Sequence, residues 1–295
     1  MGRVVNQRMV TRFKSGSRPV RRRDSVTGEE PLEIQVGGVP LAVTMRTPGS
    51  DYELAAGFLV SEGVISRKDD FAAAQYCRGP AAQGENSYNV LDIDLGPGVE
   101  PPTTDLARNF YTTSSCGICG KASIEAVETR SAFDLAGDTT RIELDRLLEM
   151  PERLLESQAV FSRTGGIHAA ALFDAATSEH LAVREDVGRH NAVDKVIGWA
   201  LMEGRLPLGG CVLQVSGRAS FELIQKAKMA GIPIFSAVSA PSSLAVELAV
   251  ASEITLAGFV RGDSLVAYSR PDRVSTGSVA ADGPETGNHE RVPVR

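Results

Sequence analysis

The chain has 295 residues, of which 42% are hydrophobic and 23% charged, with a formal net charge of −6 at pH 7. This length allows one large or two moderate globular domains, and the acidic balance argues against a chain built to bind nucleic acid. Because the sequence has no signal peptide, no membrane-length apolar run and only four cysteines, we expect a cytoplasmic protein with free thiols and no membrane partner.

Basic residues dominate the N-terminal segment, where eight lysines and arginines precede the first acidic residue, Asp24. The segment also contains Gly, Ser and Pro and shows no hydrophobic periodicity. We therefore expect residues 1–28 to form a disordered, solvated arm. The alternative is an arm that docks on an acidic partner.

Residues 29–102 are expected to form a small α+β domain. Two alternating apolar runs flank Gly37-Gly38, which is the pattern of a β-hairpin, and a helical stripe of apolar residues follows Ser50-Asp51. Proline and glycine then indicate a linker. The predicted elements are strands at 32–36, 39–45 and 88–95, a helix from about 51 to 63, and a linker over 97–102.

Residues 103–270 contain strand patterns that alternate with helix patterns. Such alternation predicts βαβ units, and hence an α/β fold with a mostly parallel sheet flanked by helices. The residues that follow are mainly Gly, Ser, Pro and charged residues, so we expect 271–295 to be a disordered tail. The predicted strands are 181–183, 211–215, 232–238, 254–260 and 265–268, and the helices lie near 193–201, 223–227 and 242–252.

Small residues and arginine follow three of these strands, at Ser216-Gly217-Arg218, Ser239-Ala240 and Arg261-Gly262-Asp263. Ligands of open α/β sheets bind beyond the carboxyl ends of the strands. Glycine allows close approach to the backbone, helix N-termini offer N–H groups to phosphate, and arginine recognises phosphate with two hydrogen bonds. The pattern suits a nucleotide-like ligand, although turn residues with solvated arginines explain it equally well.

The densest polar cluster of the sequence runs from Arg184 to Asn191, between a strand and a helix. It contains His190, which arginines and carboxylates surround, so we expect His190 to be the better candidate for a ligand-binding histidine. His168 follows a glycine pair and is a weaker candidate.

Cys116 and Cys119 form a Cys-x-x-Cys pair that precedes a helical pattern. A helix N-terminus stabilises a thiolate, which is the nucleophilic form of cysteine. A structural zinc needs four ligands, and no second pair is present. The pattern of a zinc deaminase also fails, because no glutamate follows His168 in the required place. We therefore expect no metal, and we favour a sulfur-transfer cysteine on a flexible loop over a thioredoxin-like disulfide exchanger.

Three segments together closely resemble the FdhD/NarQ family of sulfur carrier proteins, which are needed for formate dehydrogenase activity. The resemblance extends over about residues 29–268 and implies a cytidine-deaminase-like α/β domain without the deaminase zinc signature. It also implies a sulfurtransferase that takes persulfide sulfur from a cysteine desulfurase. The sulfur passes to a bound molybdenum bis-molybdopterin guanine dinucleotide cofactor, which then enters the formate dehydrogenase catalytic subunit. The three segments are residues 115–120, 183–195 and 216–220.

The resemblance also assigns residues. Cys116 matches the cysteine that carries the persulfide, and Cys119 matches the second cysteine of the pair. In the segment that binds the cofactor, the family often has Arg-Pro-Gly-Arg, whereas this chain lacks the second arginine. We expect a homodimer, with GDP or GTP binding as fragments of the cofactor. The expected cofactor-binding residues are Phe259, Val260, Arg261, Gly262, Asp263, Ser264, Arg218 and His190.

Two other functions compete with a sulfur carrier: a thiol–disulfide oxidoreductase and a cofactor-binding chaperone without sulfur chemistry. An exchanger needs both Cys116 and Cys119, a persulfide carrier needs only Cys116, and a chaperone needs neither. Single cysteine substitutions therefore separate the three.

Overall fold

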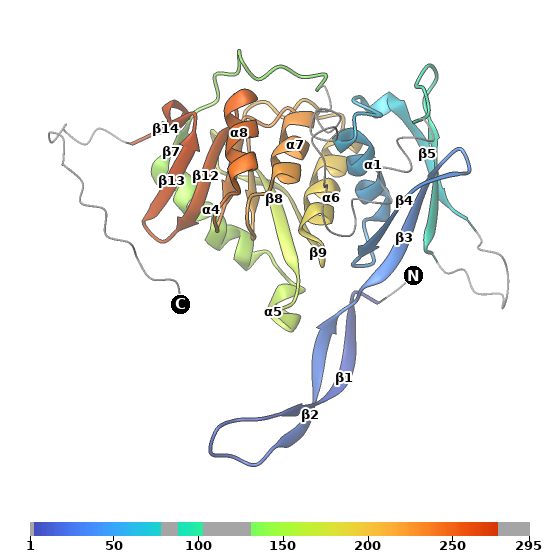
Figure 1. Ribbon diagram of the computed structural model, residues 1–295, viewed down its shortest axis with the longest axis vertical. Helices are drawn as coiled ribbons and strands as arrows, with labels where there is room; N and C mark the ends of the chain where they lie inside the picture. Colours follow the sequence, from blue (N-terminus) through green and yellow to red (C-terminus); the bar gives the residue numbers. More distant parts are fainter. Residues whose placement is uncertain (1–2, 78–87, 103–130, 277–295) are drawn as a thin grey trace, which may run out of the picture.

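The computed structural model describes residues 3–77, 88–102 and 131–276. Two main sheets lie side by side, and a long hairpin projects from between them (Figure 1). Cys116 and Cys119 lie outside the described residues. None of the helices in these three ranges is long and apolar enough to cross a membrane.

The N-terminal sheet has the strand order β4-β3-β6-β5, and helix α1 (Asp51–Ser61) packs on it. Gly37 and Gly38 have φ angles of 57° and 77°, which is the left-handed backbone of a two-residue hairpin turn. The predicted hairpin and helix are therefore confirmed. The strands are β3 (Glu30–Val36), β4 (Val39–Arg46), β5 (Phe71–Tyr76) and β6 (Val90–Leu95), and a short helix η1 (Lys68–Asp70) precedes β5.

The second sheet has six strands in the order β13-β12-β11-β10-β8-β9. The expectation of a mostly parallel sheet is wrong, because only β10–β11 and β11–β12 pair in parallel, whereas the other three pairs are antiparallel. Short turns join β8 to β9 and β12 to β13, and a short turn can join only antiparallel strands. The strands are β8 (His168–Asp174), β9 (His180–Asp186), β10 (Cys211–Val215), β11 (Ile234–Ala237), β12 (Thr255–Arg261) and β13 (Ser264–Ser269).

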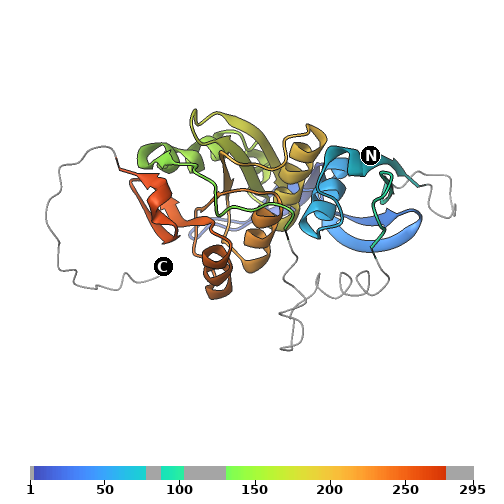
Figure 2. The same cartoon turned by 90° about the horizontal axis from the view of Figure 1, so that it is seen from above.

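Helices cover both faces of this sheet (Figure 2). Alternate residues of a strand point to opposite faces: Ala171 and Phe173 pack with α4, whereas Ala170 and Leu172 pack with the core that contains α6, α7 and α8. The predicted helices of this part are thus confirmed. The helices are α4 (Leu144–Glu156), α5 (Phe161–Thr164), α6 (Arg189–Met202), α7 (Phe221–Met229) and α8 (Ser243–Ala251).

Helices α1 and α6 join the two sheets, because they cross where a glycine of one faces the other. A Cβ atom added to Gly57 would lie 1.8 Å from the Asp194 carbonyl oxygen, and one added to Gly198 would lie 1.8 Å from the Glu53 carbonyl oxygen. Only glycine permits so close an approach. One apolar core therefore runs from the N-terminal sheet through α1 and α6 to the six-stranded sheet.

The expected disorder of residues 1–28 is wrong for most of that segment. Strands β1 (Val5–Arg12) and β2 (Val20–Thr27) form an antiparallel hairpin. Cross-strand pairs explain why a polar segment is ordered here: Arg8 lies opposite Asp24, and Gln7 Nε2 donates to Ser25 Oγ at 2.8 Å.

The expected disorder of residues 271–295 is wrong for the first residues of that segment. Residues 271–275 form a short helix η2 (Pro271–Arg273) and strand β14 (Val274–Ser275), which pairs with β7 (Ile142–Glu143). The cause is Arg273, whose buried guanidinium donates to the carbonyl oxygens of Pro233, Leu135 and Asp138 at 3.1–3.2 Å. Residues 277–295 lie outside the described part of the chain.

Candidate functional site

A cavity of about 540 Å³ lies where the strands of the six-stranded sheet end. Parallel pairing brings the carboxyl ends of β10, β11 and β12 to one edge, and antiparallel pairing brings the first residue of β8, His168, to the same edge. This is where the strand pattern predicts a ligand. Its size is typical of small-molecule sites, which measure about 300–1,000 Å³.

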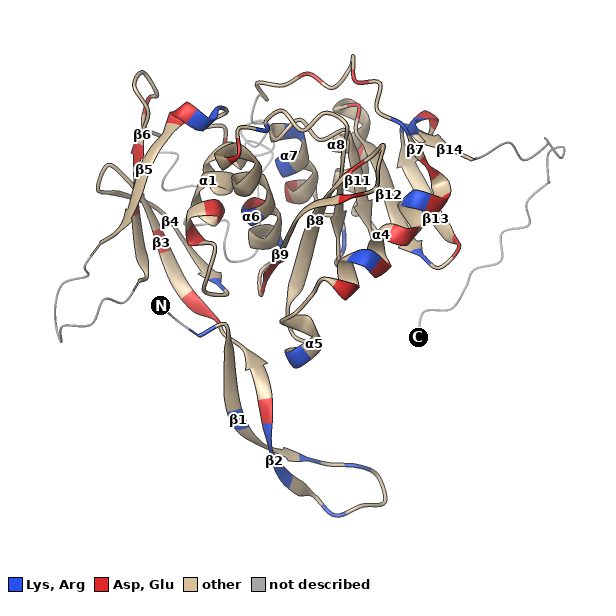
Figure 3. Cartoon of the chain, turned by 180° about the vertical axis from the view of Figure 1, so that it is seen from behind, with Lys and Arg blue, Asp and Glu red and all other residues tan. Residues whose placement is uncertain are grey.

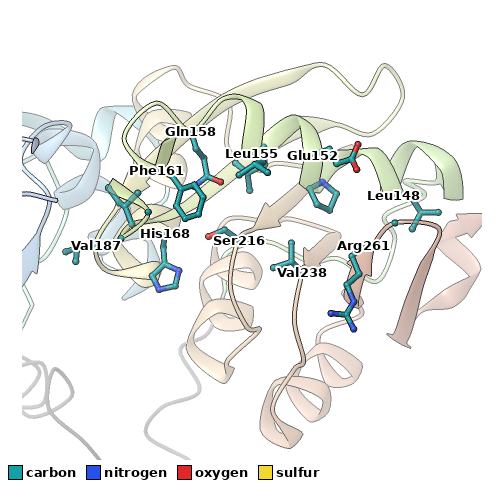
Figure 4. Close-up of a pocket in the computed structure, with 16 residues that line it drawn as sticks. Leu148, Glu152, Leu155, Gln158, Phe161, His168, Val187, Ser216, Val238 and Arg261 are labelled. Carbon is teal, nitrogen blue, oxygen red and sulfur yellow. The ribbon is translucent and has the colours of Figure 1, made fainter. Parts of the chain in front are cut away.

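The cavity has an apolar wall and a polar edge (Figure 4). Helices α4 and α5 supply the wall, which includes Leu148, Leu155 and Phe161. The strand ends supply the edge, with His168 at one end of the cavity and Arg261 at the other. Such a site can hold a planar ring against the wall and an anionic group at either end.

Strand β12 carries Arg261 to the cavity through an irregular backbone. Phe259 has a φ of 53°, which is uncommon for an aromatic residue. The register with β13 shifts between Gly258 and Arg261, which is a β-bulge. Bulges redirect the side chains that follow them. The Arg261 guanidinium lies 5.9 Å from the centre of the Phe259 ring, within the range of a cation–π contact.

The histidine end of the cavity is held by its neighbours. Ser216 Oγ accepts a hydrogen bond from the backbone N–H of Ala169 at 2.9 Å, so the first turn after β10 is tied to β8. His168 is half-buried, and this burial, followed by the charges of Arg189 and His190, lowers its pKa. The imidazole is therefore neutral near pH 7, and it can both donate and accept a hydrogen bond.

His190 does not line the cavity. Its Nε2 atom lies 2.8 Å from Glu222 Oε2 and 3.3 Å from Ser220 Oγ, which ties the start of α6 to the start of α7. The hydrogen bond from His190 is also the main reason why the pKa of Glu222 is lowered. The expectation that His190 is the stronger binding candidate therefore does not match the geometry, because His168 occupies the cavity instead.

The cluster from Arg184 to Asn191 is mostly a structural junction. Asp186 is completely buried. Its carboxylate accepts from the backbone N–H groups of Thr47 and Gly188 at 3.1 and 2.8 Å. Lys195 Nζ lies 2.7 Å from the same carboxylate and donates to the Thr47 carbonyl at 2.9 Å. Because Thr47 follows β4, these bonds hold the N-terminal sheet against α6.

Two other residues of this cluster reach neighbouring elements. The Arg184 guanidinium pairs with Glu53 of α1 through two hydrogen bonds of 2.5 Å. The Glu185 carboxylate accepts from the backbone N–H groups of Val160 and Phe161, both at 2.8 Å. Glu185 thereby fixes the start of α5, and α5 carries Phe161 into the cavity wall.

The structure brings few of the expected cofactor-binding residues to the cavity. Arg261 and Gly262 line it. Val260 is buried in the core formed with α4, and Arg218 is exposed outside the cavity lining. The other expected residues of this segment lie near the rim but not in the lining: Phe259 beneath Arg261, and Asp263 and Ser264 at the exposed β12–β13 turn.

The sequence does contain a signal for the apolar wall that the predictions above omit. Leucines recur at helical spacing in this segment, which predicts an amphipathic helix. They are Leu144, Leu147, Leu148, Leu154 and Leu155. Two faces of this helix are apolar, one toward the sheet and one toward the cavity. No pattern in the sequence indicates that α5 follows and closes the wall.

Of the cysteines within the described ranges, Cys211 is buried and Cys77 is partly exposed. Burial, reinforced by Asp174, raises the pKa of the Cys211 thiol to about 11, so this thiol is inert near neutral pH. Among described residues, no group of three or more His, Cys, Asp or Glu side chains could hold a metal ion. Cys116 and Cys119, the expected reactive pair, are not among them.

Comparisons with known proteins agree with one another. The model of the FdhD/NarQ family matches residues 27–275. The sulfur carrier protein FdhD of Mycobacterium tuberculosis is 56% identical over 278 residues, which cover 93% of this chain and 100% of the relative. The protein of the same name from Streptomyces coelicolor is 54% identical over 285 residues, or 96% of this chain and 100% of the relative.

A solved structure shares the fold. The crystal structure of a proposed formate dehydrogenase accessory protein from Desulfotalea psychrophila superposes with a TM-score of 0.73 at 22% sequence identity. The match covers 92% of this chain and 100% of the other. The mixed α/β architecture is thus that of a known fold, whereas its expected relation to cytidine deaminases stays a prediction.

Proposed function

Because the chain belongs to the FdhD/NarQ family, we propose that it is a sulfur carrier for formate dehydrogenase that transfers persulfide sulfur to a molybdenum bis-molybdopterin guanine dinucleotide. The names of its relatives support the carrier role. The cavity beyond β10, β11 and β12 supports an acceptor that binds as a ligand. The cytoplasmic location and the homodimer remain predictions.

The sulfur chemistry is assigned to Cys116. Its thiolate attacks the outer sulfur of a persulfide on a cysteine desulfurase, and the desulfurase cysteine leaves as a thiolate. The result is a persulfide on Cys116. In the transfer step the S–S bond breaks and its electron pair stays on Cys116, which returns to a thiolate; the outer sulfur passes on as neutral sulfur, and the acceptor supplies the electron pair of the new bond. Cys119 is placed second in the pair, and this scheme does not require it.

The described residues fit part of such an acceptor. A cavity of about 540 Å³ accommodates one nucleotide-sized portion. Leu155 and Phe161 offer an apolar surface to a planar ring. Arg261, exposed at the rim, matches a phosphate group by charge and by its planar fork of donors. Its distance from His168 across the cavity leaves the histidine end for a different part of the acceptor.

A nucleotide-sized cavity with one arginine and one neutral histidine is the observation that carries the acceptor-binding part of this proposal. The persulfide part is tested by intact-mass spectrometry after incubation with a cysteine desulfurase and free cysteine. We expect the mass of one added sulfur on the wild type and on Cys119→Ala, and no addition on Cys116→Ala.

Cys77→Ala serves as the matched control, because Cys77 is a described, partly exposed cysteine outside the cavity lining. It should load like the wild type. Sulfur that persists on Cys116→Ala would contradict the assignment. Loss of loading in both Cys116→Ala and Cys119→Ala would favour a disulfide exchanger, and full support of formate dehydrogenase by Cys116→Ala in cells would favour a chaperone.

A further inference from the structure

The hairpin formed by β1 and β2, here called the arm (Val5–Thr27), carries a charge opposite to that of the rest of the chain. Residues 1–28 contain eight basic residues and one acidic residue, whereas the remaining residues contain 23 basic and 36 acidic ones. Figure 3 shows the basic residues along the part of the arm that projects from the body. The arm is therefore a cationic element on an anionic protein.

The outer part of the arm is exposed on both faces. Cross-strand pairing places Arg12 with Val20 on one face and Met9 with Arg23 on the other. Three apolar side chains of this part are largely exposed: Phe13 at 76%, Val20 at 59% and Met9 at 56%. A two-stranded hairpin is marginally stable in water by itself, and exposed apolar residues favour a partner that covers them.

The base of the arm is anchored at the rim of the cavity. Thr27 Oγ1 donates to Thr164 Oγ1 of α5 at 2.9 Å. A Cβ atom added to Gly166, which lines the cavity, would lie 3.7 Å from the same Thr27 oxygen. Gly28 closes the hairpin by donating to the Val4 carbonyl at 2.7 Å. The arm and the cavity wall thus share α5 and the loop that follows it.

We propose that the arm is the docking surface for an acidic protein surface on the enzyme subunit that receives the ligand of the cavity. This inference rests on the proposed function, because it takes that function's acceptor enzyme as the occupant. The arm's place at the rim lets a bound protein stand over the cavity mouth. Transfer of the cavity ligand requires the receiving enzyme to lie close to this mouth.

The composition of the arm favours a protein over a small anion. Six of its seven basic residues are arginines, and the arm also contains Met9 and Phe13. Protein interfaces are enriched in Arg, Met and aromatic residues but depleted in Lys. Strands of eight residues extend about 26 Å at about 3.3 Å per residue. This reach exceeds what a phosphate in the cavity would need.

The test measures binding of the purified, cofactor-free formate dehydrogenase catalytic subunit of the same organism by biolayer interferometry. The variant reverses three exposed arginines of the outer arm, Arg12→Glu, Arg18→Glu and Arg21→Glu. The matched control reverses three exposed cations of the body and so changes the net charge equally; they are Lys68→Glu, Arg141→Glu and Arg205→Glu. Calorimetry with GDP and circular dichroism are run on each protein.

We expect the arm variant to bind the subunit at least about tenfold more weakly, mainly through slower association, and to lose most of the salt dependence seen for the wild type. The body control should stay within about twofold of the wild type, since single surface ion pairs contribute little. Phe13→Ser should weaken binding without changing the salt dependence. All variants should bind GDP equally.

Equal binding by the arm variant and the body control would overturn the proposal. So would an arm variant that binds the enzyme normally but dissociates in native mass spectrometry, because the occupant would then be a second copy of this chain. If the wild type binds GDP but not the enzyme subunit, the docking proposal alone is wrong. If it binds neither, the proposed function fails as well.

Discussion

The junction around Asp186 and the cavity beside Arg261 both hold polar side chains at strand ends, but they differ in where those side chains find partners. At the junction, Asp186, Lys195 and Glu185 bond to other parts of the chain. At the cavity, Arg261 is exposed and contacts only an aromatic ring among the interactions of the described residues. Polar groups that satisfy one another stabilise the fold, whereas polar groups left facing a cavity are available to a ligand.

The largest effect should come from breaking the junction with Lys195→Met. The substitution leaves Asp186 charged and buried without its cation, which costs about 3–5 kcal/mol. The free energy of unfolding from urea titration should fall by that amount. The folded protein should still bind GDP with nearly unchanged affinity, because Lys195 is not among the residues that line the cavity. A loss below about 1 kcal/mol would show that the junction is not a structural site.

Arg261→Ala should have the opposite profile. Losing a hydrogen bond to a charged group costs about 1.5–3 kcal/mol, so GDP affinity measured by calorimetry should fall roughly tenfold or more. The unfolding free energy should change by less than about 0.5 kcal/mol, as is usual at an exposed position. Arg218→Ala removes another exposed arginine, which follows β10 and lies outside the cavity lining; it is the matched control and should bind normally. Unchanged affinity for Arg261→Ala would remove it from the site.

Glu185 lies between the two regions, so Glu185→Ala should affect both. The N–H groups of Val160 and Phe161 lose their carboxylate, which should reduce stability by about 1–2 kcal/mol. Loosening α5 should also weaken GDP binding by a few-fold, on the order of 1 kcal/mol. Glu185→Gln, which retains an acceptor, should recover part of both losses. A variant that loses stability but binds GDP at full strength would separate α5 from the site.

The smallest expected effect concerns the charge of His168. Because its pKa is lowered in the free protein, the native state disfavours the protonated form. Stability is therefore lost as pH falls through about 6.5, where the unfolded chain takes up the proton first. Protonation of His168 adds positive charge to the cavity that holds the phosphates, so GDP affinity relative to His168→Gln should rise by a few-fold between pH 8 and about pH 5.5. Parallel pH profiles for both proteins would place the ligand elsewhere.

Local patterns predicted much of the fold. The Gly37-Gly38 hairpin, the helix at 51–61 and the strands ending at Val215 and Ala237 follow from periodicity and turn residues. Strand direction was not predictable in this way. The antiparallel strand β8 begins at His168 and is apolar on both faces. Its composition therefore does not predict which strands it pairs with. Sheet order depends on contacts between distant residues.

The site was predictable at its strand ends and not at its wall. Arg261 and Gly262 follow a strand in a way that predicts a ligand, and they line the cavity. The motif around His190 predicted a binding residue because polar residues are dense there. Whether a polar residue faces a ligand or another residue depends on packing. Lys195 contacts Thr47 and His190 contacts Glu222, and both partners are distant in sequence. The same holds for the arm, where Gln7 and Ser25 form a hydrogen bond only after the chain turns back.

The most direct measurement for the central claim is hydrogen–deuterium exchange of the full-length protein with and without GDP. If the cavity is the ligand site, amides of the α4–α5 wall, of the segment that enters β8 and of the β12–β13 turn should become protected, while those of residues 186–195 should exchange slowly in both states. Protection that is confined to residues 186–195, with the amides around His168 and Arg261 unchanged, would contradict the account and make the junction the binding site.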